Sequence, residues 1–296
     1  MVSEVMSAIE EFLLKFWNHY LEFYTNSYEW ILLSVSIPFT IILLEILLSG
    51  WQKSSLRRLL HPNGSALNDW ICFILVQSRI HEIFGYGLLL GIAWYIPKQI
   101  KVLLGYDLIR SIPYPFVQVI IAFIIVDFLD YWAHRFEHRS SALWEMHKFH
   151  HSPTEFNIIS AKRVHPILDV SFKRLIYAVP FAIFGSPVIT FIGFIYLRAI
   201  MSSIQHSEFK WNLGWVGKYV LISPMAHRIH HSVQEEHFDK NLGTILVWWD
   251  KLFGTWFEPD SGQHPEIGVE DNRLNHPNYF VNIYRSTHSA FRKLFA

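Results

Sequence analysis

The chain has 296 residues, of which 51% are hydrophobic, 17% aromatic and only 17% charged. Ordinary soluble domains are about one quarter charged, so this composition indicates that lipid is part of the protein's environment. The formal net charge is zero, and we therefore expect no nucleic-acid partner. The single cysteine, Cys72, excludes an internal disulfide and a cysteine-based zinc site, and we expect it to be a small buried hydrophobe.

Three apolar stretches are long enough to cross a hydrocarbon core, which takes about 20 helical residues. They run over residues 30–50, 70–96 and 112–132, and tryptophans bracket the first two. The sequence thus predicts an all-α membrane protein with about three transmembrane helices. The alternative is a buried helix bundle in a soluble protein, which several long apolar runs disfavour.

A fourth apolar region covers residues 175–204 and is interrupted by Gly185-Ser186-Pro187, a combination that breaks helices. Two full spans would need about 40 residues, more than this region supplies. One span would put the histidines before and after it on opposite sides of the membrane. If those histidines share one site, the region must turn back as a short helical hairpin.

The loop after the first stretch carries Lys53, Arg57 and Arg58, which predicts that this loop is cytoplasmic. Counting spans onward places the later histidines in a helical cap on the cytoplasmic face as well. Lys98 and Lys101 argue against this orientation, because they would then lie outside.

Histidine is the anomaly of the composition. Seventeen are present, and eleven of them fall between His134 and His237. His134 and His138 follow the third apolar stretch at a spacing of four, which puts both rings on one face of a helix. Alone, this pair is a weak signal that would also suit haem binding or chance.

Two further clusters share the pattern His-x-x-His-His, and a single histidine, His206, lies between them. Three imidazoles at i, i+3 and i+4 form one stripe on a helix. Ser140 or Ser141 is expected to cap the first of these helices and Pro153 to stop it, while Ser223-Pro224 is typical of a helix start. The clusters are His147, His150 and His151, and His227, His230 and His231.

A lone histidine is most often a surface or satisfied core residue. Nine in this arrangement predict a metal site instead, since neutral imidazole suits iron, zinc and copper. Nine ligands exceed what one ion takes, so the pattern indicates two neighbouring ions.

The chain resembles the fatty acid hydroxylase superfamily over residues 115–258, and the ordered combination of motifs is highly specific. These motifs are Asp130-Tyr-Trp-Ala-His134-Arg-Phe-Glu-His138, Leu143-Trp-Glu-Met-His147-Lys-Phe-His150-His151-Ser152, Arg163-Val-His165-Pro166, Gln205-His206-Ser207, Ser223-Pro-Met-Ala-His227-Arg-Ile-His230-His231-Ser232, Asp239-Lys-Asn241-Leu-Gly243 and Trp249-Asp250-Lys-Leu-Phe253-Gly254-Thr255. This resemblance divides the chain into N-terminal membrane helices (1–111), a diiron domain (112–258) and a C-terminal tail (259–296).

The resemblance implies that the nine histidines hold two iron ions, with zinc as a substitute in purified protein. It implies no catalytic residue beyond this centre. His165, His237, Asp130 and Asn241 are the candidates for a tenth ligand or for an outer partner of a ligand. Further acceptors for the ligands' second nitrogens are expected among Asp127, Glu137 and Asp239. For Asp130, an ion pair with Arg135 or Arg139 is the competing expectation. Arg198 is a candidate to orient a substrate headgroup, but we expect it to snorkel to the membrane interface. Gly243 and Gly254 are expected at backbone turns.

The function implied by the resemblance is dioxygen-dependent hydroxylation or desaturation of a lipid, such as a sterol, fatty acyl chain or ether lipid. The partners are then the membrane, the lipid substrate and an external electron donor, which would be a ferredoxin, small cytochrome or reductase. The protein would lie in a bacterial inner membrane or the endoplasmic reticulum with its site facing the cytoplasm.

A histidine-rich metal transporter or haem-binding membrane protein is the alternative, although the clusters follow the apolar stretches and do not lie inside them. A metalloprotease is disfavoured because the chain has no His-Glu-x-x-His.

Overall fold

The structure, a computed structural model, describes residues 28–78, 80–81, 111–173, 188–260 and 264–295, with isolated positions 14, 18, 99, 102, 103 and 109. The chain divides into two compact units, Met1–Thr40 and Ile41–Ala296. The main described part of the first unit is the beginning of helix α2 (Tyr28–Ser49). The second unit contains every candidate site residue.

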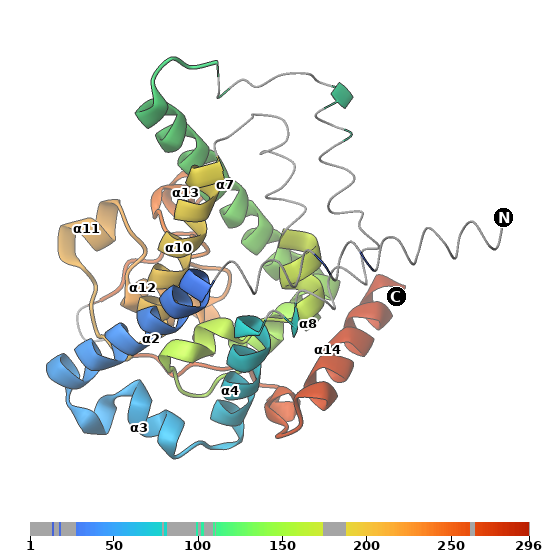
Figure 1. The fold of residues 1–296 in the computed structure, drawn as a ribbon. Coiled ribbons are helices and arrows are strands. Elements are labelled where there is room, and N and C mark those ends of the chain that lie inside the picture. Colours follow the sequence, from blue (N-terminus) through green and yellow to red (C-terminus); the bar gives the residue numbers. More distant parts are fainter. Residues whose placement is uncertain are drawn as a thin grey trace. The chain divides into compact units, whose positions relative to one another are not determined.

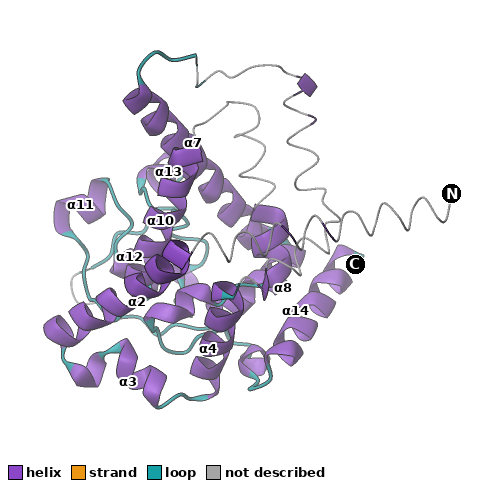
Figure 2. Cartoon of the chain, viewed as in Figure 1, coloured by secondary structure: helices purple, strands orange, loops and turns teal. Residues whose placement is uncertain are grey.

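Every regular element within the described residues is helical, which confirms the predicted all-α class (Figures 1 and 2). The β-type contacts in this part of the chain are two isolated bridges, Leu221–Leu246 and Ser232–Ile267. After α2, the α-helices are α3 (Ser55–Leu60), α4 (Gly64–Gln77), α7 (Pro115–Arg139), α8 (Ser141–His151), α10 (Val188–Gln205), α11 (Gly214–Tyr219), α12 (Pro224–His230), α13 (Trp248–Leu252) and α14 (Tyr279–Leu294). The short helical turns are η1 (Trp51–Lys53), η2 (Ile158–Lys162), η3 (Ile167–Lys173), η4 (Glu235–His237) and η5 (Asn272–Asn275).

Helix α7 corresponds to the third predicted span. Among the described residues it is the one helix that is long and apolar enough to cross a membrane. It begins with Pro115 in the first turn, where a missing N–H costs nothing, and it runs seven residues past the predicted end at Trp132. This extension makes His134 and His138 part of the same rigid helix as the span.

The described residues support the other two predicted spans only in part. The described apolar run of α2, Val35–Ser49, is shorter than a hydrocarbon core requires. Helix α4 begins at Gly64, where Asn63 accepts a hydrogen bond from Ala66 N, six residues before the predicted start of the span at Trp70. Most of the remainder of that stretch lies outside the described residues. So does the predicted break at residues 185–187, although α10 begins directly after it.

Helices α7, α8 and α12 carry the histidine clusters, α7 contacts α8 and α10, and α10 contacts α12; α14 packs along α8 (Figure 1). Phe149 on α8 is fully buried and forms a core cluster with Cys72, Leu274 and Tyr279. Cys72 is thus a buried hydrophobe, as predicted. The residues expected to be a C-terminal tail therefore include a helix that supports the back of α8.

Arg163 joins distant segments beneath the histidines. Its guanidinium is fully buried and donates to Asp69 Oδ1 at 2.6 Å, Ser152 Oγ at 2.9 Å and Asn275 Oδ1 at 2.8 Å. Ser65 accepts from the same group. A buried charge persists only where it is paired and hydrogen-bonded, and here three segments supply the partners: α4, the residue after α8, and η5. We expect this network to fix the loop that follows α8.

Candidate metal centre

Each histidine pattern of the sequence lies at the end of a helix in the structure. Ser140 caps α8 by accepting from Leu143 N, and Ser223 caps α12 by accepting from Ala226 N, with Pro224 in the first turn. These starts and the end of α8 at His151, just before Pro153, confirm the predicted boundaries. The helices thereby present their histidines on defined faces.

The structure brings all nine histidines together in two groups. Within each group the ligand atoms lie within 4.8 Å of one another. The five-histidine group consists of His134, His138, His147, His151 and His230, and the four-histidine group consists of His150, His206, His227 and His231. Helices α8 and α12 contribute to both groups, so the His-x-x-His-His pattern bridges the two sites.

The two groups are direct neighbours. The rings of His151 and His231 stack with centroids 4.1 Å apart and planes 19° from parallel. Within the five-histidine group, His134 Nε2 and His147 Nε2 approach to 3.1 Å, and within the other, His206 Nε2 and His227 Nε2 approach to 3.4 Å. Ring nitrogens therefore converge on the centre of each group.

Backbone carbonyls orient two rings of the five-histidine group. His134 Nδ1 lies 2.8 Å from Leu242 O, and His230 Nδ1 lies 2.9 Å from Lys240 O. Between these carbonyls, Asn241 adopts a left-handed backbone (φ 51°) that asparagine tolerates. Its buried side chain donates to Ala226 O at 3.0 Å and accepts from Phe257 N at 2.8 Å. Asn241 therefore positions the backbone segment that carries the two carbonyls.

Carboxylates approach two further rings of the same group. His147 Nδ1 lies 3.0 Å from Glu137 Oε2, and His138 Nδ1 lies 3.5 Å from Asp239 Oδ1. Glu137 is fully buried, and Lys173 Nζ lies 3.3 Å from the same oxygen. An outer acceptor of this kind fixes the tautomer and raises the basicity of the inner nitrogen. Glu137 and Asp239 are both predicted acceptors, whereas no motif of the chain selects Lys173.

Within the described residues, two rings of the four-histidine group face backbone carbonyls. His150 Nδ1 lies 3.1 Å from Arg163 O, and His206 Nδ1 lies 2.8 Å from Ser202 O. Around both groups, six ring nitrogens have no hydrogen-bond partner within the described chain. They are His138 Nε2, His151 Nε2, His230 Nε2, His227 Nδ1 and both nitrogens of His231.

Burial keeps these imidazoles neutral. Loss of water lowers the pKa of His206 to about 4. For six others outside α7, burial and then the neighbouring imidazoles hold the pKa well below its ordinary value. They are His147, His150, His151, His227, His230 and His231. Neutral imidazole is the form that binds metals, so the groups are ready to accept ions near neutral pH.

In the loop after α12, the backbone at Leu242 and Gly243 packs closely against the side chain of Asp250. Asp250 accepts from Leu242 N at 2.7 Å, Gly243 N at 2.8 Å and Thr255 Oγ1 at 2.6 Å. A Cβ on Gly243 would lie 2.7 Å from Asp250 Oδ2, so only glycine fits there. Gly254 adopts φ 73°, as its predicted turn requires. These contacts set the carbonyl that orients His134.

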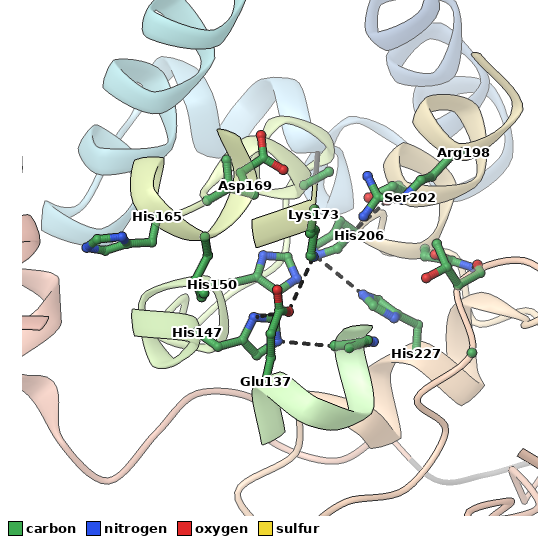
Figure 3. Close-up of a pocket in the computed structure, with 17 residues that line it drawn as sticks. Glu137, His147, His150, His165, Asp169, Lys173, Arg198, Ser202, His206 and His227 are labelled. Atoms are coloured by element: carbon green, nitrogen blue, oxygen red, sulfur yellow. Dashed lines mark hydrogen bonds and ion pairs between the residues drawn. The ribbon is translucent and has the colours of Figure 1, made fainter. Parts of the chain in front are cut away.

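Like Asn241, the other three candidates for a tenth ligand, His165, His237 and Asp130, lie outside both groups. His165 Nε2 lies 3.1 Å from Thr287 Oγ1, its Nδ1 accepts from Ile167 N, and Figure 3 shows its ring pointing away from the other histidines. His237 is buried against Phe257, with ring centroids 4.7 Å apart.

Asp130 pairs with Arg198 Nε at 2.9 Å. The expected partners of Asp130 were wrong, because Arg135 donates to Tyr131 and Arg139 approaches Asp239. The partner comes from α10, 68 positions along the chain, a distance that local sequence spacing does not reveal.

Comparison with known proteins identifies this region. Residues 119–255 match the fatty acid hydroxylase family, and this segment contains all nine histidines. The histidine-bearing region belongs to the fatty acid hydroxylase superfamily. No solved structure matches the chain.

Several relatives match parts of this chain. The ornithine lipid hydroxylase of Rhizobium tropici is 30% identical over 152 residues, which cover 51% of this chain and 45% of the relative. The alkylglycerol monooxygenase of Homo sapiens is 33% identical over 175 residues, 59% of this chain and 36% of the relative. A probable Delta(7)-sterol 5(6)-desaturase of Neurospora crassa is 27% identical over 197 residues, 64% of this chain and 49% of the relative. Each matched segment thus spans less than half of the relative's length.

Proposed function

We propose that this chain is a membrane-bound oxygenase that uses two iron ions and dioxygen to hydroxylate or desaturate a lipid. The observation that carries the proposal is the pair of adjoining histidine groups, five and four, with ligand atoms within 4.8 Å in each. Membership of this region in the superfamily and the relatives' names, which are lipid hydroxylases, monooxygenases and a desaturase, support it.

The donor set fits two ions. A buried ring nitrogen without a partner costs about 1–3 kcal/mol, and six such atoms border the two groups. A metal ion at each group would satisfy inward-facing nitrogens among them. Nine neutral imidazoles are more than one ion can bind. Zinc has the same preference for imidazole, so purified protein could carry it as a substitute.

When bound, iron supplies the redox chemistry with dioxygen that oxidises a C–H bond. In a hydroxylation, one oxygen atom enters the C–H bond, and the other becomes water with two electrons and two protons. In a desaturation, two hydrogens leave the lipid and both oxygen atoms become water, again with two electrons and two protons. An external donor, a ferredoxin, small cytochrome or reductase, is the proposed source of the electrons.

The chain's own residues orient the centre and exclude water. Carbonyls of Leu242, Lys240 and Arg163 hold rings in one tautomer, and the Glu137 carboxylate lies 3.0 Å from His147 Nδ1. Asn241 positions a loop that carries two of these carbonyls. For His165, His237 and Asp130 we propose only roles as outer partners that support the ligands, and no role as metal ligands.

We further propose that the protein crosses the membrane several times, with residues 1–111 as membrane helices and the centre (112–258) at the cytoplasmic face. The apolar α7, which could cross a membrane and ends in His134 and His138, supports this placement. The basic residues Arg57 and Arg58 after α2 favour the cytoplasmic side. A metal transporter is disfavoured, because the relatives are named as lipid enzymes.

Metal analysis of the purified protein and lipid mass spectrometry of cells with and without it test the proposal together. We expect two irons per chain and lipids that gain an oxygen or lose two hydrogens only when the protein is present. The variant His230→Ala should abolish the lipid change, whereas His288→Ala, on the exposed side of α14, should not. Metal flux without any lipid change would contradict the proposal and favour transport.

A further inference from the structure

Helix α14 carries an exposed aromatic stripe, which consists of Phe280, Tyr284 and Phe291. These side chains are 67%, 68% and 54% exposed, and Leu294 and Phe295 beyond them are exposed as well. Spacings of four and seven residues place the three rings on one face of the helix. A surface helix of a soluble protein turns such a face toward the core, so an exposed stripe indicates contact with lipid or with another protein.

The opposite face of α14 is held in place by a buried asparagine. The Asn282 side chain is fully buried and donates to Asn68 Oδ1 at 2.9 Å and to His276 O at 2.8 Å. On the same side, Tyr279 packs against Phe149 of α8 with ring centroids 5.9 Å apart. Turning the helix to bury the aromatic stripe would break these hydrogen bonds and leave Asn282 unsatisfied. The stripe therefore stays on the outside.

The charge of α14 favours an anionic surface. Its 16 residues include Arg285, Arg292 and Lys293 and no aspartate or glutamate. Arg292 and Lys293 are exposed in the last turn, next to Phe291. Aromatic rings at the boundary of the acyl chains, together with basic side chains among the headgroups, are typical of a helix that lies in the membrane surface. The charge thus favours lipid over a protein partner for the stripe.

Helix α14 also lies close to the end of the proposed span. Helix α7 ends at Arg139, α8 begins two residues later at Ser141, and α14 packs along α8 (Figure 1). If α7 crosses the membrane as proposed, α8 and α14 lie near its cytoplasmic boundary. Helix α14 is outside residues 119–255, so the family match assigns it no role.

We propose that α14 is an interfacial anchor. Its aromatic stripe lies at the boundary of the acyl chains in the cytoplasmic leaflet, and Arg292 and Lys293 contact the headgroups of anionic phospholipids. This inference rests on the membrane placement within the proposed function and goes beyond it. Because α14 packs along α8, the anchor holds the histidines of α8 close to the membrane surface.

Quenching by nitroxide lipids tests the contact on the iron-loaded full chain. Cys72 is the single cysteine and is buried, so a cysteine introduced by Tyr284→Cys or Phe291→Cys is the one that takes the fluorophore NBD. The labelled protein is placed in vesicles of phosphatidylcholine and phosphatidylglycerol, with or without a lipid that carries a nitroxide near the headgroup end of its acyl chain. An interfacial helix sinks its apolar face roughly 5–10 Å, so the nitroxide should lower the emission of both labels at least about twofold.

Glu236→Cys is the matched control, at an acidic side chain that is 68% exposed, and its emission should change little. Unchanged emission at both Tyr284→Cys and Phe291→Cys would overturn the proposal. Emission that depends on the density of labelled protein, and not on the nitroxide lipid, would identify a second copy of the chain as the occupant and would also overturn it. Each labelled variant keeps two of the three rings of the stripe.

Omission of phosphatidylglycerol tests the recognition of anionic lipid. Each basic residue near an anionic surface strengthens attachment about fivefold, so quenching should fall when the vesicles contain phosphatidylcholine alone. The double variant Arg292→Gln and Lys293→Gln should lose this difference between the two vesicle types. Lys218→Gln, at an exposed ion pair with Glu258, is the control and should keep it. Equal quenching in both vesicle types before the basic residues are replaced would overturn the recognition of anionic headgroups.

A label on α7 separates this inference from the proposed function. Val119 is 39% exposed on the candidate span, so Val119→Cys should be quenched by a lipid with its nitroxide deep in the acyl chain. Quenching at Val119 without quenching at Tyr284 would overturn the anchor and leave the membrane placement standing. No quenching at either position would overturn both. Lipid contact of α14 without oxidation of any lipid would contradict the oxygenase and leave the anchor standing.

Discussion

The five-histidine group and the four-histidine group use one type of ligand, but their surroundings differ. In the first group, Glu137 lies 3.0 Å from Nδ1 of His147, and Asp239 lies 3.5 Å from Nδ1 of His138. In the second group the outer partners among the described residues are the carbonyls of Arg163 and Ser202. His231, in the second group, has neither nitrogen hydrogen-bonded within the described chain.

This contrast teaches that an all-histidine ligand set does not make two equal sites. A carboxylate behind an imidazole makes the ring a stronger donor and holds it in place, and losing such a partner typically costs 10–100-fold in metal affinity. We therefore expect the ion in the five-histidine group to bind more tightly than the ion in the four-histidine group.

Removing one ligand from each group should have the largest effect. We expect His230→Ala and His227→Ala each to lower the metal content from two ions toward one. Lipid oxidation should fall by more than the roughly 100-fold that the loss of an outer partner can cost. Metal analysis by mass spectrometry and product analysis check this expectation.

The comparison would fail if both variants kept two ions. It would also fail if His288→Ala, at an exposed position of α14, lost metal as they do, since that would indicate a general loss of structure.

Glu137→Gln should have the next largest effect and should separate the groups. The variant keeps the shape of the side chain and removes the charge near His147, so binding at the five-histidine group should weaken by roughly 10–100-fold. In a metal titration against a chelator, the dissociation constant of the tighter site should rise toward that of the weaker site. Glu258→Gln, at a half-exposed carboxylate, is the control. Equal shifts of both steps would mean that Glu137 does not act on one group.

The histidine patterns could be predicted from the sequence because helix geometry converts a spacing of three or four residues into one face. His147, His150 and His151 needed only a helix and its cap at Ser140, both of which the local sequence specifies. The all-α class followed in the same way from long apolar runs.

Contacts between distant segments could not be predicted. Lys173 follows no motif and looks like a cation at the edge of an apolar region, yet the fold brings it to Glu137, 36 positions earlier. Arg198 reaches Asp130 from another helix, and Arg163 binds partners from three segments. A lysine close before a long apolar run was the one available signal for Lys173.

An acid titration of the metal-free protein tests a property that both groups share, the burial of neutral imidazoles. Burial lowers the pKa of the seven histidines of the two groups that lie outside α7, to about 4 for His206, so the unfolded chain binds more protons than the folded chain below pH ~6.5. Stability should be constant above that value and fall as the pH drops toward 4, with each such histidine contributing up to about 1.4 kcal/mol per pH unit.

The midpoint of thermal unfolding against pH measures this effect. Iron-loaded protein should resist acid further, because the ions compete with protons for the same nitrogens. A metal-free protein with a flat profile from pH 7 to pH 4 would contradict the burial of neutral rings.

The caps of α8 and α12 should give the smallest effects. Ser140→Ala and Ser223→Ala each remove a side chain that accepts from the helix backbone, so each should lower the free energy of unfolding by about 1 kcal/mol. Both helices supply both groups, so neither variant should change one metal-binding step alone. Chemical denaturation and metal titration check the two parts. A selective loss at one group would show that the caps position individual rings.

X-ray diffraction from crystals of the iron-loaded protein, recorded at the iron absorption edge, tests the central claim most directly. The account predicts two anomalous peaks, one enclosed by the five-histidine group and one by the four-histidine group. A single peak, or a peak away from both groups, would contradict it.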